Sequence, residues 1–437
     1  MQAVLIFAGQ SCRFRPLREK SFFPVAGTTL VEEQVRRLKQ AGLNDILLVA
    51  GAHNRNEAAA RFPTLKMVQQ EDLTLGMRGA LLSALPHCNN EPVMVVSGND
   101  LIDSSAYETL LMMTRKMKTG GAILARKVKE YFPGGYLTVK QNRITGIVEK
   151  PAPGTEPSDL VNIVAHIHVS ASSLLKALNE VKPAKDDGYE LALDALMQRE
   201  KYVAVPYAGS WQPVKYPWHL LSVLPLLLPT NRKPIIHGTA SVHPTAVIEG
   251  AVIIGPHVRV FAHATVMGPC TIGEGTIVAN NALVRGSSVG KNCVIGYSTE
   301  IARSVLGDDV WTHSSYVGDS VFGNNISLGA GTVTGNLRLD EGEISSVIDG
   351  VQLPTGLTKF GAIVGDDCRL GIHTSLLPGI KIGAGSFISS AVVIGTDVPD
   401  ASFVKNGDTA GSLIIRKNTK SAPAPAERTK FKRGLGK

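Results

Sequence analysis

A glycine-containing loop with two cationic side chains follows the first apolar stretch of this chain. Residues 2–8 have the apolar pattern of a buried strand, and Gly9, Arg13 and Lys20 come after them. The backbone N–H groups of such a loop can wrap around phosphate groups. The guanidinium and ammonium groups add positive charge that suits a triphosphate. By themselves these residues fit a tight surface turn equally well, so their chemistry depends on the elements that position them.

Apolar strand patterns alternate with amphipathic helix patterns through the first 228 residues. This alternation predicts an α/β domain with a mostly parallel sheet covered on both faces. In such folds ligands bind at the carboxyl ends of strands, which is where the glycine-containing loop lies. Strands are expected at residues 2–8, 45–49, 92–96, 121–125, 143–148 and 162–169, and helices at 30–41, 75–85, 107–117, 172–181 and 189–200.

In the second half of the chain an aliphatic residue returns at about every sixth position. A period of six fits neither a helix nor a half-buried strand, so it indicates a repeat architecture. Each repeat would form a short strand and a turn, and stacked coils would bury a continuous aliphatic column. The sequence therefore predicts a parallel β-helix, with inward residues Val242, Ile248, Ile254, Val260, Val266, Ile272, Val278, Val284, Val289, Ile295, Ile301, Val310, Tyr316, Phe322, Leu328, Val364, Leu370, Leu376, Ile382, Ile388 and Ile394.

The length of 437 residues suits two domains, which we expect at 1–228 and 237–415, with a linker at 229–236. The net charge of +8 lies almost wholly in residues 416–437, where apolar side chains are few. We therefore expect a disordered basic tail there, in preference to a nucleic-acid-binding arm. A break at 337–360 interrupts the repeat, and the sequence assigns it no role.

The five cysteines, at positions 12, 88, 270, 293 and 368, are scattered without metal-ligand spacing. This pattern favours free thiols in a reducing cytosol. The start of the chain has no basic leader, and no run of about 18 apolar residues could cross a membrane. We expect a cytoplasmic protein that binds neither nucleic acid nor a membrane.

The first loop resembles the signature Ala-Gly-x-Gly-Thr-Arg-Met…Pro-Lys-x-Leu of sugar-phosphate nucleotidylyltransferases, with Ala8, Gly9, Arg13 and Lys20 at matching positions. The resemblance implies a Rossmann-like nucleotidyltransferase domain. Such an enzyme joins an NTP, here UTP or dTTP, to a hexose or N-acetylhexosamine 1-phosphate and releases pyrophosphate. It also implies that Ala8 and Gly9 bind the nucleotide and that Arg13 and Lys20 are catalytic.

Three residues of the loop depart from that signature. Ser11 stands at the second Gly, Cys12 at the Thr, and Glu19 at the Pro before the Lys. Because serine carries a Cβ and tolerates positive φ poorly, we expect a reshaped loop.

Further matches follow in the order of the family. Gln70 and Gly76 resemble a base-reading segment, in which a Gln amide and a Gly backbone face a pyrimidine. Gly135, Glu149 and Asn162 resemble residues that line the sugar. Each match alone has a simpler structural explanation, whereas their common order supports the resemblance.

Two segments resemble the metal-binding segments of the same family. Mg²⁺ on a triphosphate is usually held by oxygen ligands. Asp100 is the expected ligand, in preference to Asn99, because a carboxylate is the harder ligand. Pro213 stands at the second ligand position and has no side-chain oxygen, which leaves Gln212, a backbone carbonyl or water to substitute.

The repeat half resembles the left-handed hexapeptide β-helix of acyltransferases, and especially the acetyltransferase half of bacterial bifunctional N-acetylglucosamine-1-phosphate uridylyltransferases. The resemblance implies that His313 takes the proton of a substrate amine that attacks the thioester of acetyl-CoA. Neutral imidazole suits this general-base task. Arg285, Tyr316 and Asn336 match other residues of that site.

The acetyltransferase site also has departures. Ala302 and Gly342 stand near the places of two sugar-phosphate lysines, and Ser327 stands at an asparagine that binds the amino sugar. Three hypotheses remain: a nucleotidylyltransferase, a bifunctional enzyme that also transfers an acetyl group, and a catalytically impaired regulatory or scaffold protein that binds NDP-sugar. In all three, flat β-helix faces are expected to pack into a homotrimer.

Overall fold

The computed structural model describes residues 1–116 and 119–432, which divide into two compact units. The sheet unit comprises Met1–Gln10 and Leu30–Pro213, and the prism unit comprises Ser11–Thr29 and the chain from Val214 onward. The domain boundary predicted from the sequence, at residue 228, placed Ser11–Thr29 and residues 214–228 in the first domain. In the structure both segments belong to the prism unit. No helix within the described ranges is long and apolar enough to cross a membrane.

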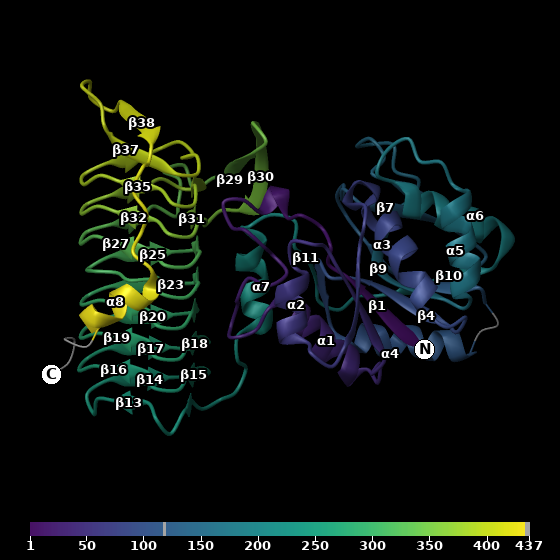
Figure 1. Cartoon of the computed structure of the whole chain (residues 1–437), viewed down its shortest axis with the longest axis horizontal. Helices are drawn as coiled ribbons and strands as arrows, with labels where there is room; N and C mark the ends of the chain where they lie inside the picture. Colours follow the sequence, from purple (N-terminus) through teal and green to yellow (C-terminus); the bar gives the residue numbers. More distant parts are fainter. Residues whose placement is uncertain (117–118, 433–437) are drawn as a thin grey trace. The chain divides into compact units, whose positions relative to one another are not determined.

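The sheet unit is built on a nine-stranded sheet of order β3-β2-β1-β4-β9-β6-β10-β8-β7 (Figure 1). Its strands are β1 (Gln2–Ile6), β2 (Ile46–Ala50), β3 (Lys66–Gln69), β4 (Val93–Ser97), β6 (Gly121–Lys127), β7 (Gly135–Lys140), β8 (Arg143–Glu149), β9 (Leu160–His168) and β10 (Tyr202–Pro206). A two-stranded sheet pairs β5 (Asp100–Ile102) with β11 (Trp211–Pro213).

Helices cover both faces of this sheet, as the alternating pattern predicts. On one face Val4 and Ile6 pack in a core with α3, α5 and α6, while the intervening Leu5 is buried toward the other face. The helices are α1 (Leu30–Gln40), α2 (Arg55–Arg61), α3 (Gly76–Ala84), α4 (Ser104–Lys116), α5 (Ala171–Glu180) and α6 (Gly188–Arg199). Residue 117 of the expected helix 107–117 lies outside the described residues.

The sheet is mixed, which differs from the mostly parallel sheet expected from sequence. Strands β3, β2, β1 and β4 are parallel, as are β6 and β10, but β9 runs antiparallel to β4 and β6. The sequence pattern missed β7, which pairs antiparallel with β8. Gln141 and Asn142 join these strands with φ of 46° and 60°. Consecutive left-handed residues form the tight hairpin turn that forces an antiparallel pair.

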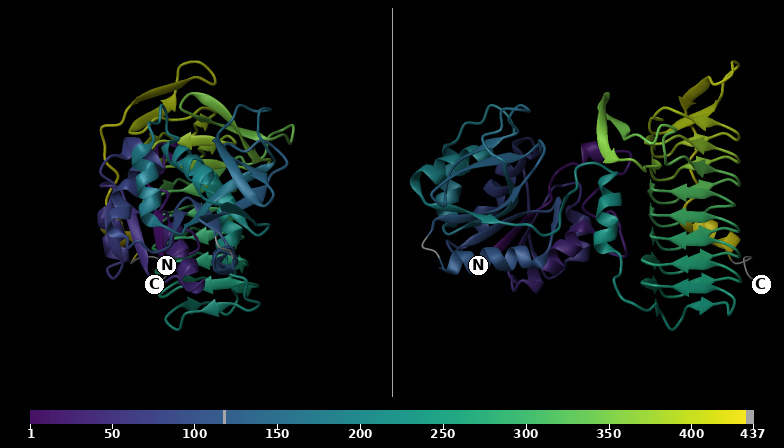
Figure 2. Two further views of the ribbon diagram at one scale, coloured as in Figure 1. Left: turned by 90° about the vertical axis from the view of Figure 1, so that its right-hand side faces the viewer. Right: turned by 180° about the vertical axis from the view of Figure 1, so that it is seen from behind.

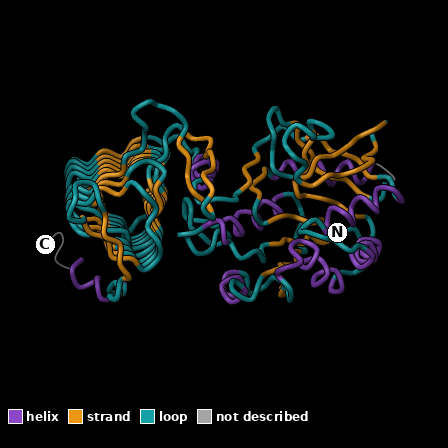
Figure 3. Tube along the Cα trace, turned by 90° about the horizontal axis from the view of Figure 1, so that it is seen from above, coloured by secondary structure: helices purple, strands orange, loops and turns teal. Residues whose placement is uncertain are grey.

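The prism unit is a parallel β-helix, as the six-residue period predicts, and its strands stack into three parallel faces (Figure 3). One face contains β12 (Ile235–Ile236), β15 (Val252–Ile254), β18 (Cys270–Ile272), β21 (Ser288–Val289), β24 (Val305–Leu306), β26 (Val321–Phe322), β31 (Ala362–Val364) and β34 (Ile380–Ile382). The second contains β14 (Val247–Glu249), β17 (Thr265–Met267), β20 (Leu283–Arg285), β23 (Glu300–Ala302), β25 (Tyr316–Gly318), β28 (Val333–Thr334), β33 (Ser375–Leu376) and β36 (Val393–Ile394). The third contains β13 (Ser241–Val242), β16 (Arg259–Val260), β19 (Ile277–Val278), β22 (Val294–Ile295), β27 (Ser327–Leu328), β32 (Arg369–Leu370), β35 (Phe387–Ile388) and β37 (Ser402–Asn406).

Inward aliphatic residues stack from coil to coil. Val242 pairs with Val260, Val260 with Val278, and Val278 with Ile295. Most of the predicted inward residues are buried in one continuous core. Tyr316 is a correction: its neighbour Val317 is fully buried and pairs with Ile301, so Tyr316 lies outside the column. Trp311 pairs with Val294 and Ser327, so fully buried Thr312, and not Val310, takes the inward place of its coil, and Val317 follows it after a five-residue step.

The break in the repeat is a hairpin that leaves the stack (Figure 2). Strand β29 (Ile344–Ile348) pairs antiparallel with β30 (Val351–Leu357), and Asp349 and Gly350 form the turn at φ of 49° and 79°. The coil resumes across the insertion, since Ala362 N donates to Ser320 Oγ at 3.0 Å, 42 residues away in sequence.

The basic tail is ordered through residue 432, which corrects the expected disorder, while residues 433–437 lie outside the described part. Strand β38 (Leu413–Lys417) pairs with β37, and α8 (Pro425–Lys432) follows. Arg428 is buried: it donates to Asn325 Oδ1 at 2.6 Å and Ser327 Oγ at 2.8 Å, with its guanidinium carbon 4.2 Å from the Trp311 ring centroid. Composition could not reveal this order because polar contacts of cations, chiefly buried Arg428 together with Lys432, hold the helix, rather than an apolar face.

We expect Arg428→Ala to detach α8 from the prism. The substitution removes hydrogen bonds from a charged donor, each of which contributes about 1.5–3 kcal/mol, together with the cation–π contact. Limited trypsin digestion at Lys430 and Lys432 should accelerate at least about tenfold, since about 1.4 kcal/mol corresponds to tenfold in an equilibrium. Arg416→Ala, on exposed β38, is the matched control, and equal cleavage of the two variants would contradict the role of Arg428.

Candidate functional site

Three residues expected to line a sugar meet on adjacent strands of the sheet unit. Gly135 on β7 is the cross-strand partner of Glu149 on β8. A Cβ at Gly135 would stand 2.9 Å from Asn162 Oδ1 on β9. The antiparallel β8-β7-β9 arrangement therefore gathers Gly135, Glu149 and Asn162, and Gly135 leaves the space that the asparagine amide needs.

Lys150 follows Glu149 and turns back over it. Its Nζ lies 2.8 Å from Glu149 Oε1, its φ is 44°, and its N–H donates to Gly134 O at 3.0 Å. Burial disfavours the charge of Lys150, but the hydrogen bond and the charge of Glu149 outweigh it, so the pKa of Lys150 is raised. A cation and a carboxylate thus stand side by side next to the candidate sugar residues.

The sequence reading missed two acids of this cluster, Glu190 and Asp186. Burial, followed by the charge of Glu149, raises the pKa of Glu190 to about 7. Asp186 acts electrostatically on both Lys150 and Glu190. Glu190 lies in the first turn of α6, within a stretch that reads only as an amphipathic helix, so its proximity to β8 is a tertiary property that periodicity does not contain.

The candidate base-reading segment adjoins the same cluster. Gly76 has φ of 51° and ψ of −136°, and a Cβ there would stand 2.0 Å from Asp186 Oδ1. This backbone conformation and this approach both require glycine. Buried Gln70 donates from Nε2 to Asp72 O and to Gly76 O, both at 2.9 Å. In this structure the Gln70 amide holds the segment in shape through its N–H groups.

The two candidate metal segments face each other in the sheet unit. Asp100 on β5 is the cross-strand partner of Pro213 on β11, and Asp100 Oδ1 accepts from Trp211 Nε1 at 2.9 Å. The described residues contain no group of three or more His, Cys, Asp or Glu side chains arranged to hold a metal. Mg²⁺ commonly uses one or two carboxylates together with substrate phosphates and water. One carboxylate at this place fits such an ion.

Ala8 and Gly9 lie at the carboxyl end of β1. Ala8 is buried, whereas the exposed Gly9 has open space where a Cβ would stand. A ligand can therefore approach the Gly9 backbone closely.

The cationic loop belongs to the prism unit, although it follows β1 directly. Arg13 is exposed, with its guanidinium carbon 5.9 Å from the centroid of Tyr216, which stacks on Trp218 at 4.5 Å. Trp218 is buried and lies 6.3 Å from Phe360 between ring centroids. An aromatic stack thus lies beneath Arg13, and the sequence reading missed Tyr216 as part of it.

Two departures from the family signature contact each other in this loop. Ser11 has φ of 54°, and its Oγ donates to Glu19 Oε1 at 3.2 Å. The same carboxylate oxygen accepts from Ser21 N at 2.9 Å. Phe14 and Phe23 pack edge-on inside the loop, with centroids 6.4 Å apart. Serine adopts the glycine-like conformation here, and a hydrogen bond to Glu19 offsets part of its strain.

In the prism unit the candidate acetyltransferase residues fall into two groups. Tyr316 and Asn336 meet, since Asn336 Nδ2 donates to Tyr316 Oη at 3.1 Å. Asn336 also donates to Asp319, and Arg303 pairs with both oxygens of Asp319 at 2.6 Å. The sequence reading missed Asp319, whose charge already neutralises Arg303.

The remaining two residues make no hydrogen bond or ion pair with Tyr316 or Asn336 in the described part of the chain, although Glu300, the partner of Arg285, is the cross-strand neighbour of Tyr316. Arg285 pairs with Glu300 at 2.7 Å. His313 is exposed on the turn before β25, and within residues 1–116 and 119–432 its side chain makes no hydrogen bond or ion pair. The structure therefore joins Tyr316 to Asn336, but it does not join His313 or Arg285 to them.

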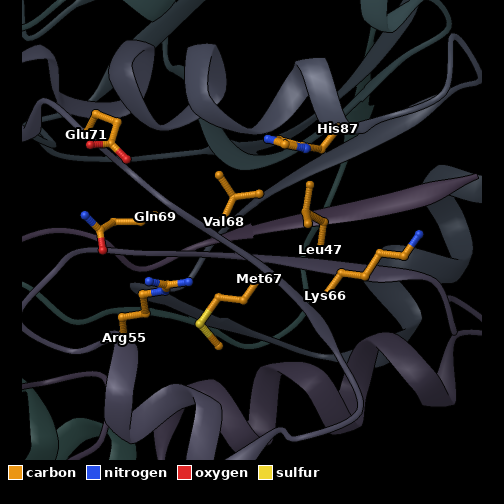
Figure 4. Close-up of a pocket in the computed structure, with 8 residues that line it drawn as sticks. All are labelled: Leu47, Arg55, Lys66, Met67, Val68, Gln69, Glu71 and His87. Carbon is orange, nitrogen blue, oxygen red and sulfur yellow. The ribbon is translucent and has the colours of Figure 1, made fainter.

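Two cavities adjoin candidate residues: Gln69 and Glu71, on either side of Gln70, line one, and Gly335 and Leu337, on either side of Asn336, line the other. One, of about 550 Å³, lies along edge strand β3 and includes Arg55, Lys66 and His87 (Figure 4). The other, of about 940 Å³, lies between the β29–β30 hairpin and the adjoining coils, with a mostly apolar lining that includes Leu337 and Leu377. Neither contains a residue expected from the sequence to bind substrate.

Two known families match segments of the chain. The family described as MobA-like NTP transferase domain matches residues 3–242. The family described as GMPPB C-terminal domain matches residues 230–322.

Relatives match over nearly the whole length. The bifunctional sugar-1-phosphate nucleotidylyltransferase/acetyltransferase of Sulfurisphaera tokodaii is 31% identical and is aligned over 93% of this chain and 100% of that protein. The bifunctional protein GlmU of Methanocaldococcus jannaschii is 29% identical, over 95% and 100%. A crystal structure of a putative glucose-1-phosphate thymidylyltransferase from Bacillus anthracis, in complex with a sucrose, has a TM-score of 0.46 and 17% identity, over 52% of this chain and 95% of that one.

We expect Glu190→Gln to change how stability depends on pH. The folded pKa of about 7 exceeds the ordinary 4.5. The wild-type contribution is therefore fully present below pH 4.5 and is lost as pH rises through 7. Above that window the variant should be more stable by at most about 3 kcal/mol, since one pKa unit corresponds to about 1.4 kcal/mol.

Thermal unfolding at acidic and at mildly alkaline pH measures this difference. Glu108→Gln, at an exposed position of α4, should shift the unfolding temperature equally at both pH values. A wild-type pH profile in Glu190→Gln would refute the titration of Glu190 in this window.

Proposed function

This chain belongs to the family of bifunctional sugar-1-phosphate nucleotidylyltransferase/acetyltransferases, with a MobA-like NTP transferase domain at its amino end, and we propose that it makes an NDP-sugar. The substrates are UTP or dTTP and a hexose or N-acetylhexosamine 1-phosphate, and the second product is pyrophosphate. The observation that carries this proposal is the meeting of Gly135, Glu149 and Asn162 on three adjacent strands. The adjoining Lys150 and Gly76 extend the same polar cluster.

The reaction is an in-line displacement at phosphorus. A phosphate oxygen of the sugar 1-phosphate attacks the α-phosphorus of the NTP, and the bond from that phosphorus to the β-bridging oxygen breaks as pyrophosphate leaves. Glu149 and Asn162 bind the sugar hydroxyl groups, and Gly135 admits the ring. Arg13 and Lys20 stabilise the negative charge that develops on the leaving pyrophosphate. The protein thus acts mainly by positioning and by neutralising charge.

Asp100 is the residue proposed to hold Mg²⁺, with substrate phosphates and water as the other ligands. When bound, the ion neutralises oxygens of the triphosphate and orients it. Pro213 opposite Asp100 supplies no side-chain oxygen, so Asp100 would be the one carboxylate of this pair to hold the ion. Binding of the metal should therefore depend strongly on the nucleotide.

We expect pyrophosphate release from at least one pairing of UTP or dTTP with a hexose or N-acetylhexosamine 1-phosphate. Arg13→Ala or Lys20→Ala should lower kcat by about 10²–10³, the usual effect of removing a group that stabilises transition-state charge. Lys39→Ala, at an exposed position of α1, is the control. Chelation with EDTA should abolish turnover, and added Mg²⁺ should restore it.

The competing hypothesis is a protein that binds NDP-sugar without turnover. Two results together would support this hypothesis: no combination of NTP and sugar 1-phosphate releases pyrophosphate in the presence of Mg²⁺, and calorimetry detects binding of a nucleotide sugar that does not depend on metal. That outcome would end the proposal of nucleotidyl transfer.

We propose a second activity, transfer of an acetyl group from acetyl-CoA to an amino sugar, at the face where the prisms of a homotrimer meet. The contact between Tyr316 and Asn336 supports this candidate. His313 would take the proton of the amine as its nitrogen attacks the thioester carbon, and CoA leaves as the thiol. Because Asp319 neutralises Arg303, the acceptor site carries less positive charge than two lysines would give it.

We expect His313→Ala to abolish CoA release while pyrophosphate release continues unchanged. The two readouts separate because the two reactions use different residues. His263→Ala, another exposed turn histidine of the prism, should retain both activities. Equal loss of both activities in His313→Ala would refute acetyl transfer through this residue.

A further inference from the structure

The cationic loop at residues 11–29 is attached to the prism at separate coils. Ala26 N donates to Ser288 Oγ on β21 at 2.8 Å. Arg18 Nε lies 3.4 Å from Asp366 Oδ2, and Arg18 Nη2 lies 3.7 Å from Asp367 Oδ2. Ser288 is buried, so its hydroxyl is a fixed acceptor.

A backbone N–H and a side-chain amide of the prism orient the two carboxylates that meet Arg18. Asp366 Oδ1 accepts from Asn324 N at 2.8 Å, and Asp367 Oδ1 accepts from Asn325 Nδ2 at 2.7 Å. The Asp366 side chain is only 16% exposed. Burial raises the pKa of its carboxyl, and the charge of Arg18 acts in the opposite direction. Each acid thus keeps one oxygen in the turn of a coil and presents the other to the loop.

Contacts within the loop connect the attached residue Arg18 to the two proposed catalytic cations, Arg13 and Lys20. Leu17, next to Arg18, is buried, and Leu17 N donates to Phe14 O at 3.1 Å. The bond from Ser11 Oγ to Glu19 ties the start of the loop to the residue before Lys20. Arg13 and Lys20 therefore flank a folded segment, and a shift at Arg18 moves both.

We propose that Ser288, Asp366 and Asp367 of the prism are positioning residues for nucleotidyl transfer. They hold the loop in the conformation that presents Arg13 and Lys20 to the triphosphate. This inference rests on the proposed nucleotidyl transfer, and it gives the prism a part in a reaction that its own coils do not perform.

The test is a variant that removes these three attachments and keeps the prism intact, while the longer ion pair of Arg15 Nη1 with Asp400 Oδ2, at 3.9 Å, remains. Asp366→Asn and Asp367→Asn retain the oxygens that accept within the turns, and Ser288→Ala removes one hydroxyl. The triple variant should lose about tenfold in kcat/KM for the NTP, because an exposed ion pair and a hydrogen bond are each worth a few-fold. The KM for the sugar 1-phosphate should not change, because its proposed ligands lie in the sheet unit.

An aspartate at the equivalent turn of another coil provides a matched control. Asp308 accepts from Lys291 N at 2.7 Å just as Asp366 accepts from Asn324 N, and within the described ranges it has no ion pair with the loop. Asp308→Asn should leave kcat/KM unchanged. Arg18→Lys should retain most activity because it keeps the charge, whereas Arg18→Glu should lose more than Arg18→Ala because it faces two carboxylates.

Hydrogen–deuterium exchange of residues 11–29 in the protein without substrate tests the same inference without turnover. Exchange should rise in the triple variant and remain at the wild-type level in Asp308→Asn. Unchanged exchange together with unchanged kinetics would overturn the positioning role. If the wild type released no pyrophosphate, the proposed function would fail, while raised loop exchange would still support the attachment and unchanged exchange would still refute it.

Discussion

Each six-residue repeat forms one side of a coil and buries a single inward side chain, so no coil is stable without neighbours above and below. This constraint organises the prism unit. Val260 and Val278 gain their burial only because successive coils repeat the same inward position. Once that column exists, its strands and the turns at its corners are fixed in space, and polar groups on them become rigid attachment points. Ser288 and Asp366 are two such groups, and the amino-terminal loop is bound to both.

Much of this architecture was predictable from the sequence, because side chains buried at regular intervals appear in the sequence as aliphatic residues at regular intervals. The five-residue step from Val284 to Val289 read correctly, since both residues are buried in the column. Tyr316 was predicted incorrectly, because the six-residue step was counted from Val310, whereas polar Thr312 takes the inward place in that coil and Val317 follows it. Hairpin β7–β8 was missed since its turn, Gln141-Asn142, lacks the glycine that usually marks a left-handed turn.

The candidate sites divide in the same way. A family signature pointed to Gly135, Glu149 and Asn162, and strand pairing brings these three together. Glu190, Asp186 and Asp319 left no local trace, because their importance comes from neighbours that the fold supplies. Ser11 and Glu19 each look like a defect in the sequence, yet each hydrogen-bonds to the other. Two residues that each differ from the family signature can compensate for one another, and only the three-dimensional structure shows that they are in contact.

Coil length varies along the prism. Hydrogen bonds between equivalent corners span 18 residues at His257 and Thr239, 17 at Cys293 and Thr276, and 16 at Ser320 and Ser304. Beyond the β29–β30 hairpin Leu370 pairs with Ile388, again 18 residues (388 − 370) apart. The strands stay in register throughout, so the lost residues come from the corners. Linear alignment of related chains drifts by a position at each shortened corner. Equivalent positions in related proteins of this kind are therefore best matched by coil number and by face of the prism. An alignment gap should be placed at a corner rather than within a strand.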